Sequence, residues 1–373
     1  MSCDFVSLAL SGVQHLKPYQ PGKPIEELER ELGISNSLKL ASNENPLGPS
    51  PLAVKALELE LSALSLYPDG NGFALKQALA KKLDVAETSI TIGNGSNEIL
   101  ELIARTFLAP DREVIFSEHA FAVYPLVAQA VGATAEISAA NSTNHAMPYG
   151  HDLSAMQALI NDKTRVIFVA NPNNPTGTWL ASAELESFIQ AVPENIIVVI
   201  DEAYFEYVEE EEYPDTLQWI KRFPNLVVTR TFSKIYGLAG LRIGYSVSSP
   251  VVADLLNRVR QPFNTNTLAQ AGAVAALDDN DHVSRSVIMN RDGLKQLQSG
   301  FNDMGLSWIP SVANFIAVNL GQPGLPIYQK LLQEAVIVRP VENYGLPDYL
   351  RITVGNAEQN ERVLIALKKV LAQ

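Results

Sequence analysis

Residues 225–245 have the sequence NLVVTRTFSKIYGLAGLRIGY. Its first part, Asn225–Arg230, is an apolar run rich in β-branched residues, a pattern that predicts a buried strand. Ser233 and Lys234 follow this strand, and glycines then interrupt the chain up to and beyond Arg242. A fold does not need an amine, a hydroxyl and a guanidinium directly after a buried strand. These side chains therefore indicate a ligand site at the end of the strand.

The chemistry of the three side chains suits a phosphorylated aldehyde. The amine of Lys234 can form a Schiff base with pyridoxal phosphate, while Ser233 and Arg242 can hold the phosphate of that cofactor. The alternative is an ordinary loop lysine at the start of a helix, and a Ser-Lys pair on its own favours this alternative. Other motifs of the chain favour the cofactor.

Buried strands and amphipathic helices alternate through the middle of the sequence. Strand-like runs occur at Ser89–Ile92, Glu113–Phe116, Arg165–Val169, Asn195–Ile200, Leu226–Arg230 and Arg242–Val247, and helical stretches include Asn97–Phe107, Ala181–Ala191 and Val251–Val259. This alternation predicts an α/β fold with a mostly parallel central sheet flanked by helices. Ligands of such sheets bind beyond the carboxyl ends of the strands, where the motifs of this chain fall.

The length of 373 residues predicts one large and one small domain. Residues 46–279 would form a large domain that binds pyridoxal phosphate. Residues 1–45 and 280–373 would pack together as a smaller α+β domain, made of an N-terminal arm and a C-terminal part. In the C-terminal part we expect helices at Val283–Gly300, at Ile327–Glu334 and from Ala357, and strands at Phe315–Leu320, Val336–Arg339 and Tyr349–Thr353.

The composition narrows the class of protein. A net charge of −13 and a pI near 4.9 argue against nucleic acid and anionic membranes as partners. Cys3 is the single cysteine, which is typical of a reducing cytoplasm and excludes a cysteine-based metal site, so we expect no metal. No run approaches the about 20 apolar residues of a membrane span, and the N-terminus lacks the basic region of a signal peptide. These features predict a cytoplasmic protein.

Two loops that follow strands can contact a cofactor. Gly93–Glu98 opens a helix, and its free backbone N–H groups, with the side chains of Ser96 and Asn97, suit a phosphate. Asn171–Gly177 (NPNNPTG) is a rigid turn from which the amide of Asn174 can donate to a phenolate oxygen. Each loop taken alone is more typical of a plain turn or helix cap.

Asp201 and Tyr204, within the sequence DEAY, end another buried strand. A carboxylate at this position is poorly solvated and needs a cationic partner. The N–H of a pyridinium ring is such a partner, and by holding that proton Asp201 would keep the cofactor ring an electron sink. Tyr204 can reach the same phenolic oxygen as Asn174. The alternative for Asp201 is a helix cap.

Arg339 and Arg351 lie on or beside apolar runs near the C-terminus. An arginine in such a place is costly unless it meets an anion. Together they suggest a cleft for a substrate carboxylate or phosphate. An internal ion pair is the alternative for either arginine singly.

The motifs occur in one order over nearly the whole chain, and together they resemble the class I and II aminotransferases of pyridoxal-phosphate fold type I. They are NPNNPTG at Asn171–Gly177, DEAY at Asp201–Tyr204, SKIYGLAGLRIGY at Ser233–Tyr245 and LRITVG at Leu350–Gly355. Within that family the chain is most similar to the histidinol-phosphate aminotransferases, by Leu16–Tyr19, Asn43–Pro46, Tyr67–Gly70, Gly95–Glu98 and the pair Arg339 and Arg351.

The resemblance implies a role for each matching residue. Lys234 would be the Schiff-base lysine and proton carrier, with an amine kept partly neutral by a dry cleft and by Arg242. Asp201 would bind the pyridine nitrogen, and Asn174 and Tyr204 the phenolic oxygen. The phosphate of the cofactor would be bound by Ser96, Asn97, Ser233 and Arg242. The anionic end of the substrate would be bound by Tyr19, Arg339 and Arg351, with Asn174 nearby.

Two tyrosines receive further roles from the resemblance. Tyr124 would stack on the cofactor ring, although Ser117–Tyr124 departs from the family by carrying Glu-His where relatives carry proline and small residues. Phe121 in this segment cannot form the hydrogen bond of a tyrosine. Tyr67 would reach the cofactor phosphate of a neighbouring subunit, which makes the expected enzyme a homodimer.

The implied reaction is amino transfer between L-histidinol phosphate and 2-oxoglutarate, which yields imidazole-acetol phosphate and L-glutamate in histidine biosynthesis. Two alternatives remain open: an aromatic amino acid aminotransferase, and a pyridoxal-phosphate lyase that decarboxylates an amino acid such as phosphothreonine. A regulator that borrowed the fold is disfavoured, because the chain has no spare basic segment for DNA.

Overall fold

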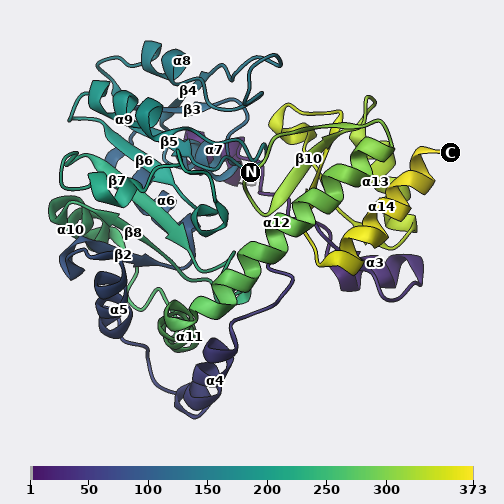
Figure 1. Ribbon diagram of the computed structural model, residues 1–373. Coiled ribbons are helices and arrows are strands. Elements are labelled where there is room, and N and C mark those ends of the chain that lie inside the picture. The colour runs from purple at the N-terminus through teal and green to yellow at the C-terminus, as the bar shows by residue number, and fades with distance from the viewer. Residues whose placement is uncertain (1–2, 373) are drawn as a thin grey trace.

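The computed structural model describes residues 3–372 and consists of a large and a small part joined by one long helix (Figure 1). The large part contains a seven-stranded sheet with the order β2-β8-β7-β6-β5-β3-β4. The strands are β2 (Ile90–Gly93), β3 (Glu113–Ser117), β4 (Thr134–Ser138), β5 (Thr164–Ala170), β6 (Ile197–Asp201), β7 (Leu226–Thr231) and β8 (Gly244–Ser248).

The strands β3 to β7 pair in parallel, and β8 is antiparallel to both of its neighbours. The predicted α/β fold with a mostly parallel sheet is therefore confirmed. Because β8 runs the other way, its first residues lie at the same edge as the last residues of β7. This reversal brings the segment around Arg242 back to the edge where β5, β6 and β7 end.

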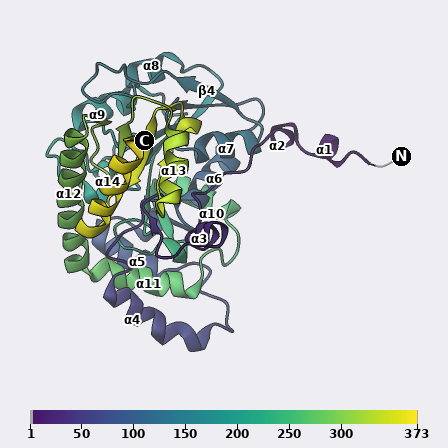
Figure 2. The same cartoon turned by 90° about the vertical axis from the view of Figure 1, so that its right-hand side faces the viewer.

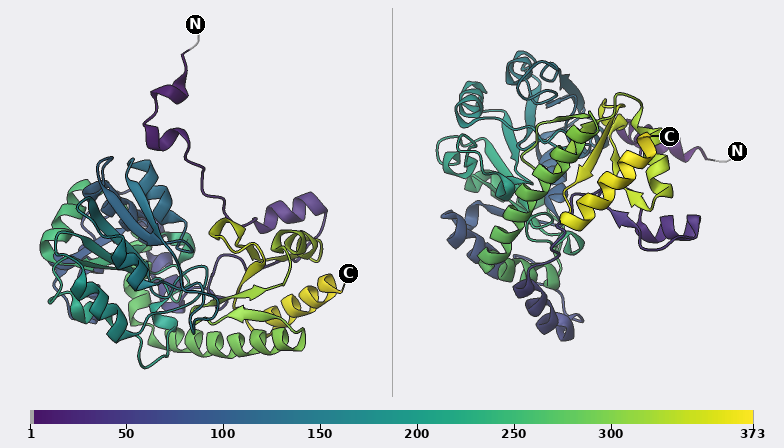
Figure 3. Two further views of the ribbon diagram at one scale, coloured as in Figure 1. Left: turned by 90° about the horizontal axis from the view of Figure 1, so that it is seen from above. Right: turned by 45° about the vertical axis from the view of Figure 1, so that its right-hand side comes forward.

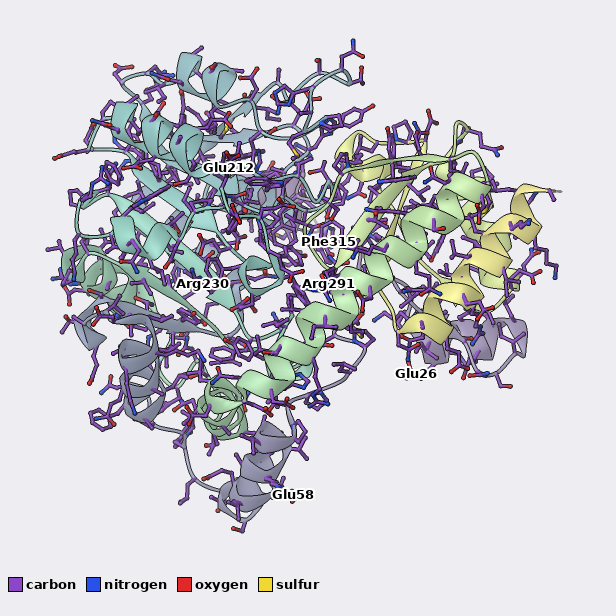
Figure 4. All side chains as sticks on the ribbon, viewed as in Figure 1. Glu26, Glu58, Glu212, Arg230, Arg291 and Phe315 are labelled. Atoms are coloured by element: carbon purple, nitrogen blue, oxygen red, sulfur yellow. The ribbon has the colours of Figure 1, made fainter. Side chains whose placement is uncertain are left out.

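Both faces of the large sheet are buried, which explains its continuous apolar strands. On β5, Val166 and Phe168 face one core together with helices α6 (Ser96–Phe107), α7 (Val123–Ala130) and α10 (Pro250–Val259), while Ile167 and Val169 face the other. Arg230 is the exception in a fully buried strand (Figure 4). Its guanidinium pairs with buried Glu202 at 2.7 Å, which removes the cost of an isolated charge.

The helices of the large part surround this sheet. They are α4 (Pro51–Glu60), α5 (Phe73–Leu83), α6 (Ser96–Phe107), α7 (Val123–Ala130), α8 (Leu153–Ala158), α9 (Ser182–Ala191), α10 (Pro250–Val259) and α11 (Thr267–Asp278). Short 3-10 turns occupy Leu61–Ala63, Glu87–Ser89, Phe205–Tyr207, Thr216–Trp219 and Ala239–Leu241.

The small part draws on both ends of the chain. Its four-stranded sheet has the order β12-β13-β10-β9, and β1 pairs in parallel with β11. These strands are β1 (Leu38–Lys39), β9 (Ser307–Ile309), β10 (Phe315–Asn319), β11 (Val336–Ile337), β12 (Arg339–Pro340) and β13 (Tyr349–Thr353). The helices are α3 (Ile25–Leu32), α12 (Asn280–Asp303), α13 (Gly324–Gln333) and α14 (Ala357–Leu371), with a 3-10 turn at Glu342–Tyr344.

The pairing of β1 with β11 supports the proposed domain boundaries near residues 45 and 280, which stay a proposal. The first two helices do not pack with the small part. Helix α1 (Phe5–Leu8) and helix α2 (Ser11–Gln14) form an arm that stands away from the body of the chain (Figures 2 and 3). Helix α2 contacts the large part at α7. Over residues 3–372, no helix has the length and apolar character needed to cross a membrane.

Candidate active site

One cavity lies where the carboxyl edge of the large sheet meets the small part. Its volume is about 210 Å³. Eleven of the predicted site residues line it: Tyr19, Ser96, Asn97, Asn174, Asp201, Tyr204, Ser233, Lys234, Arg242, Arg339 and Arg351. Two predicted residues, Tyr67 and Tyr124, are not among its lining residues.

Lys234 follows β7 and extends its amine into this cavity. Its Nζ donates to the carbonyl oxygen of Ser42 at 2.9 Å and lies 5.7 Å from the ring centre of Tyr204. Burial, followed by the positive charge of Arg351, lowers the pKa of Lys234 from its ordinary 10.5 to about 8. A cavity lysine whose pKa lies near neutral pH can act as a nucleophile or a base.

Asp201, the last residue of β6, forms the floor of the cavity and is only 5% exposed. Its Oδ1 accepts from the Thr229 hydroxyl at 2.9 Å, and its Oδ2 accepts from the Tyr124 hydroxyl at 2.9 Å. Burial raises the pKa of this carboxyl group, and the two hydrogen bonds oppose the rise. Within residues 3–372 Asp201 takes part in no ion pair, so a cationic ligand group would complete its surroundings.

One end of the cavity is built to hold an anion. Helix α6 begins at Ser96 without a side-chain cap, which leaves the N–H groups of its first turn free. Arg242 approaches from the segment before β8, and its Nη1 donates to the hydroxyl of Ser233 at 3.2 Å. Gly95 has a φ of 77°, and a β-carbon there would lie 2.3 Å from Nη2 of Arg242. Only glycine permits this approach.

Tyr204 and Asn174 lie in the middle of the cavity. The side-chain amide of Asn43 donates to the Tyr204 hydroxyl at 2.9 Å, and burial raises the pKa of Tyr204 to about 12, so this hydroxyl keeps its proton at neutral pH. The backbone N–H of Asn43 donates to Thr353 on β13. The sequence named Asn43 only as part of a motif. Its contact with Tyr204, 161 residues further along the chain, leaves no pattern in the local sequence.

The other end of the cavity presents two guanidinium groups. Arg351 on β13 is buried, and it donates to Oδ1 of Asn174 at 2.5 Å and to the carbonyl oxygen of Ala41 at 2.5 Å. Its Nε is buried without a hydrogen-bond partner. Arg339 lies nearer the surface with its guanidinium 5.8 Å from the ring centre of Tyr19. The ring of Phe315, at the junction of the two parts (Figure 4), packs 5.3 Å from the Arg351 guanidinium.

The predicted ring-stacking role of Tyr124 does not agree with its position. Its side chain is completely buried below the cavity, with its hydroxyl on Asp201 and its ring stacked on Phe168 at 4.7 Å. Phe121 lines the cavity instead. The two aromatic residues lie three positions apart, where α7 begins, and only the structure distinguishes which ring faces the ligand. We therefore assign ring stacking to Phe121 as a proposal.

Tyr67 lies on the surface, in the segment between α4 and α5. Its side chain is 83% exposed, and its ring stacks on Phe263 at 4.8 Å. Tyr67 does not line the cavity of its own chain. Its place is compatible with the predicted contact to a neighbouring subunit, which stays a proposal.

The donor set fits pyridoxal phosphate. The free N–H groups of α6 and the guanidinium of Arg242 match its phosphate. The unpaired carboxylate of Asp201 matches its ring nitrogen, and the lowered pKa of Lys234 matches a reaction with its aldehyde. The unpartnered Nε of Arg351 leaves a donor for a further anion at the opposite end.

Known proteins resemble the chain over its full length. A protein of Pseudomonas fluorescens named histidinol-phosphate aminotransferase 2 is 58% identical over 375 residues, covering 100% of each chain. A relative of the same name from Pseudomonas aeruginosa is 57% identical over 371 residues, covering 99% of each. The crystal structure of histidinol-phosphate aminotransferase from Sinorhizobium meliloti in complex with pyridoxal-5'-phosphate matches with a TM-score of 0.88 at 28% identity, over 97% of each chain.

The family described as aminotransferase class I and II matches residues 35–367, a range that includes every motif from Asn43 onward and most of both parts. The order of the motifs, the sheet and the residues that line the cavity agree with this match. The chain belongs to the class I and II aminotransferases.

Proposed function

We propose that this aminotransferase uses pyridoxal 5'-phosphate to exchange the amino group of L-histidinol phosphate with 2-oxoglutarate, giving imidazole-acetol phosphate and L-glutamate in histidine biosynthesis. The main support for an aminotransferase reaction is the amine of Lys234, whose pKa is about 8. It lies in the same cavity as Arg242 and Arg351, which offer two anion sites. The substrate rests on the names of relatives that are 58% and 57% identical to the chain.

The residues of the cavity divide the work between them. When bound, pyridoxal phosphate supplies an aldehyde that takes up the amino group and a ring that accepts electron density from the neighbouring carbon. Lys234 would hold that aldehyde in the resting enzyme, and its neutral amine, once displaced by the incoming amino donor, would take the proton from Cα of the substrate. Asp201 holds a proton on the ring nitrogen. Tyr204 and Asn174 hold the phenolic oxygen and so fix the orientation of the ring.

Two different anions must use the end of the cavity near Arg351 in turn. Histidinol phosphate brings a phosphate ester, and 2-oxoglutarate brings a second carboxylate. A guanidinium donates to a phosphate and to a carboxylate in the same planar, two-pronged geometry, which a lysine ammonium cannot do. Arg339 and Tyr19, which are less buried, add contacts at the mouth.

The homodimer is part of this proposal. The exposed ring of Tyr67 would contact the cofactor phosphate of a second subunit, so each site would need both chains. We also propose a cytoplasmic location, which suits a chain whose single cysteine, Cys3, is unpaired.

The test is a comparison of amino donors. The purified protein with its cofactor would receive 2-oxoglutarate and, in turn, L-histidinol phosphate, L-phenylalanine or O-phospho-L-threonine, and the glutamate and carbon dioxide released would be measured. We expect glutamate at far lower concentrations of histidinol phosphate than of phenylalanine. Preference for phenylalanine would make the protein an aromatic aminotransferase, and carbon dioxide from phosphothreonine would make it a lyase.

A further inference from the structure

Tyr124 lies directly beneath the floor of the cavity. Its hydroxyl donates to Oδ2 of Asp201, and the Thr229 hydroxyl donates to Oδ1, both at 2.9 Å. Tyr124 is fully buried and Asp201 is 5% exposed. Each oxygen of the carboxylate therefore holds one protein donor and retains a lone pair for a ligand.

The position of the Tyr124 hydroxyl is fixed by the aromatic rings around it. Its ring is stacked on Phe168 of β5 at 4.7 Å and an interplanar angle of 7°. Phe121 meets it edge-on at 5.9 Å and 89°, and Phe116 of β3 lies at 6.3 Å. Three neighbours leave the ring little freedom, so the hydroxyl oxygen stays beside Asp201.

The hydroxyl also acts as a permanent donor. Burial and the charge of Asp201 raise the pKa of Tyr124 well above its ordinary 10, so the phenol stays protonated. The same burial raises the pKa of Asp201, which favours the neutral acid, whereas donation from Tyr124 and Thr229 favours the carboxylate. If Asp201 were neutral, it would hold the proton that the ring nitrogen needs.

We propose that Tyr124 is a positioning residue that keeps Asp201 ionised and oriented, and thereby keeps the proton on the ring nitrogen of the bound cofactor. It acts through Asp201 and does not touch the cofactor. Phe121, on the same ring cluster, lines the cavity, so one packed unit serves both the face and the nitrogen of the ring. The inference rests on the proposed cofactor site and not on the identity of the amino donor.

The experiment measures where the proton lies, without any substrate. Pyridoxal phosphate labelled with ¹⁵N in its ring would be bound to the unmodified protein and to Tyr124→Phe, and the ring nitrogen would be observed by solid-state NMR. We expect a pyridinium resonance in the unmodified protein. In Tyr124→Phe the resonance should move towards neutral pyridine at the same pH, because the carboxyl group has lost a donor.

Matched variants separate this role from simple packing. Tyr207→Phe removes another buried tyrosine hydroxyl, one that makes no hydrogen bond to Asp201, and should leave the resonance in place. Thr229→Val should shift it, and Thr229→Ser, which keeps the hydroxyl, should not. In turnover, Tyr124→Phe should lower kcat by about tenfold with little change in KM, because the proton matters in the transition state.

An unshifted pyridinium resonance in Tyr124→Phe would overturn the proposal, as would an equal shift in Tyr207→Phe. Failure of histidinol phosphate as amino donor would refute the proposed substrate and leave the nitrogen resonance untouched. The two proposals are therefore tested separately.

Discussion

The amine of Lys234 is reactive only without its proton, and the cavity makes that form accessible near neutral pH. With a pKa of about 8 in place of 10.5, about one amine in ten is neutral at pH 7, compared with about one in three thousand for an exposed lysine. We expect the rate at which pyridoxal phosphate attaches to the cofactor-free protein to rise with pH and level off above about 8. Stopped-flow absorbance over a pH series measures this rate.

A variant of the neighbouring arginine checks the cause. The charge of Arg351 contributes to the low pKa of Lys234, so Arg351→Gln should move the midpoint of the pH profile upwards. Arg285→Gln, at an exposed side chain of α12, is the control and should not move it. A midpoint near 10.5 in the unmodified protein would contradict the structure.

Arg351 should also determine how well both substrates bind. Arg351→Ala removes a guanidinium that meets the anionic end of each substrate before and during the reaction, so KM should rise for both while kcat changes less. The loss of a charge-assisted contact corresponds to a rise of about tenfold or more. Steady-state kinetics with each substrate varied in turn measures it. An unchanged KM for both would remove Arg351 from the site.

Single residues show how far the sequence could lead. Lys234 and Asp201, which follow or end buried strands, line one cavity together with Arg242 and Arg351. The role of Tyr124 was not predicted correctly. The sequence around the start of α7 contains two aromatic residues, Phe121 and Tyr124, and does not show which of them faces the ligand. That choice depends on packing against Phe168, a residue of another strand.

At the scale of elements, the turn between β2 and α6 makes the phosphate end. Gly95→Ala would place a β-carbon 2.3 Å from Arg242 and strain a backbone with φ of 77°. We expect the affinity for pyridoxal phosphate to fall by about tenfold or more, because the N–H groups and the guanidinium can no longer converge. Gly33→Ala is the control, since its φ is also positive, at 64°, but no atom lies within 4 Å of the new carbon. Equal affinities of the unmodified protein and both variants for pyridoxal phosphate would exclude this turn from the phosphate site.

Two of the strands that the sequence did not predict lack a strong pattern. β4 (Thr134–Ser138) is an edge strand with exposed and half-buried residues, so it lacks the apolar run that identified its neighbours. β9 (Ser307–Ile309) is too short for any periodicity. The antiparallel direction of β8 also escaped prediction, since an apolar run carries no sign of direction. The buried strands β5 to β7 and the long helix α12 were predicted almost to their ends.

For the whole molecule, the proposed dimer makes each site a product of two chains. We expect the protein to sediment at about twice the 40.7 kDa of one chain. Lys234→Ala and Tyr67→Ala should each be nearly inactive as pure dimers. A hybrid of the two variants would contain one complete site, because intact Lys234 of one chain meets intact Tyr67 of the other.

Differently tagged chains allow this hybrid to be purified and assayed. It should regain about half of the activity of the unmodified dimer. If Tyr67 instead served its own chain, the hybrid would have no complete site and would remain as weak as its parents. A hybrid of Lys234→Ala with the unmodified chain gives the scale for one working site.

The contact between Arg351 and the carbonyl oxygen of Ala41 joins positions 310 residues apart in the sequence. The ribosome therefore delivers the two ends of the cavity at different times. Within one chain, the residues proposed to hold the cofactor phosphate have all been synthesised by residue 242, whereas both arginines proposed for the substrate and the strand partner of β1 come after residue 335. A growing chain therefore contains the residues proposed for its cofactor phosphate before it contains the two arginines proposed for its substrate.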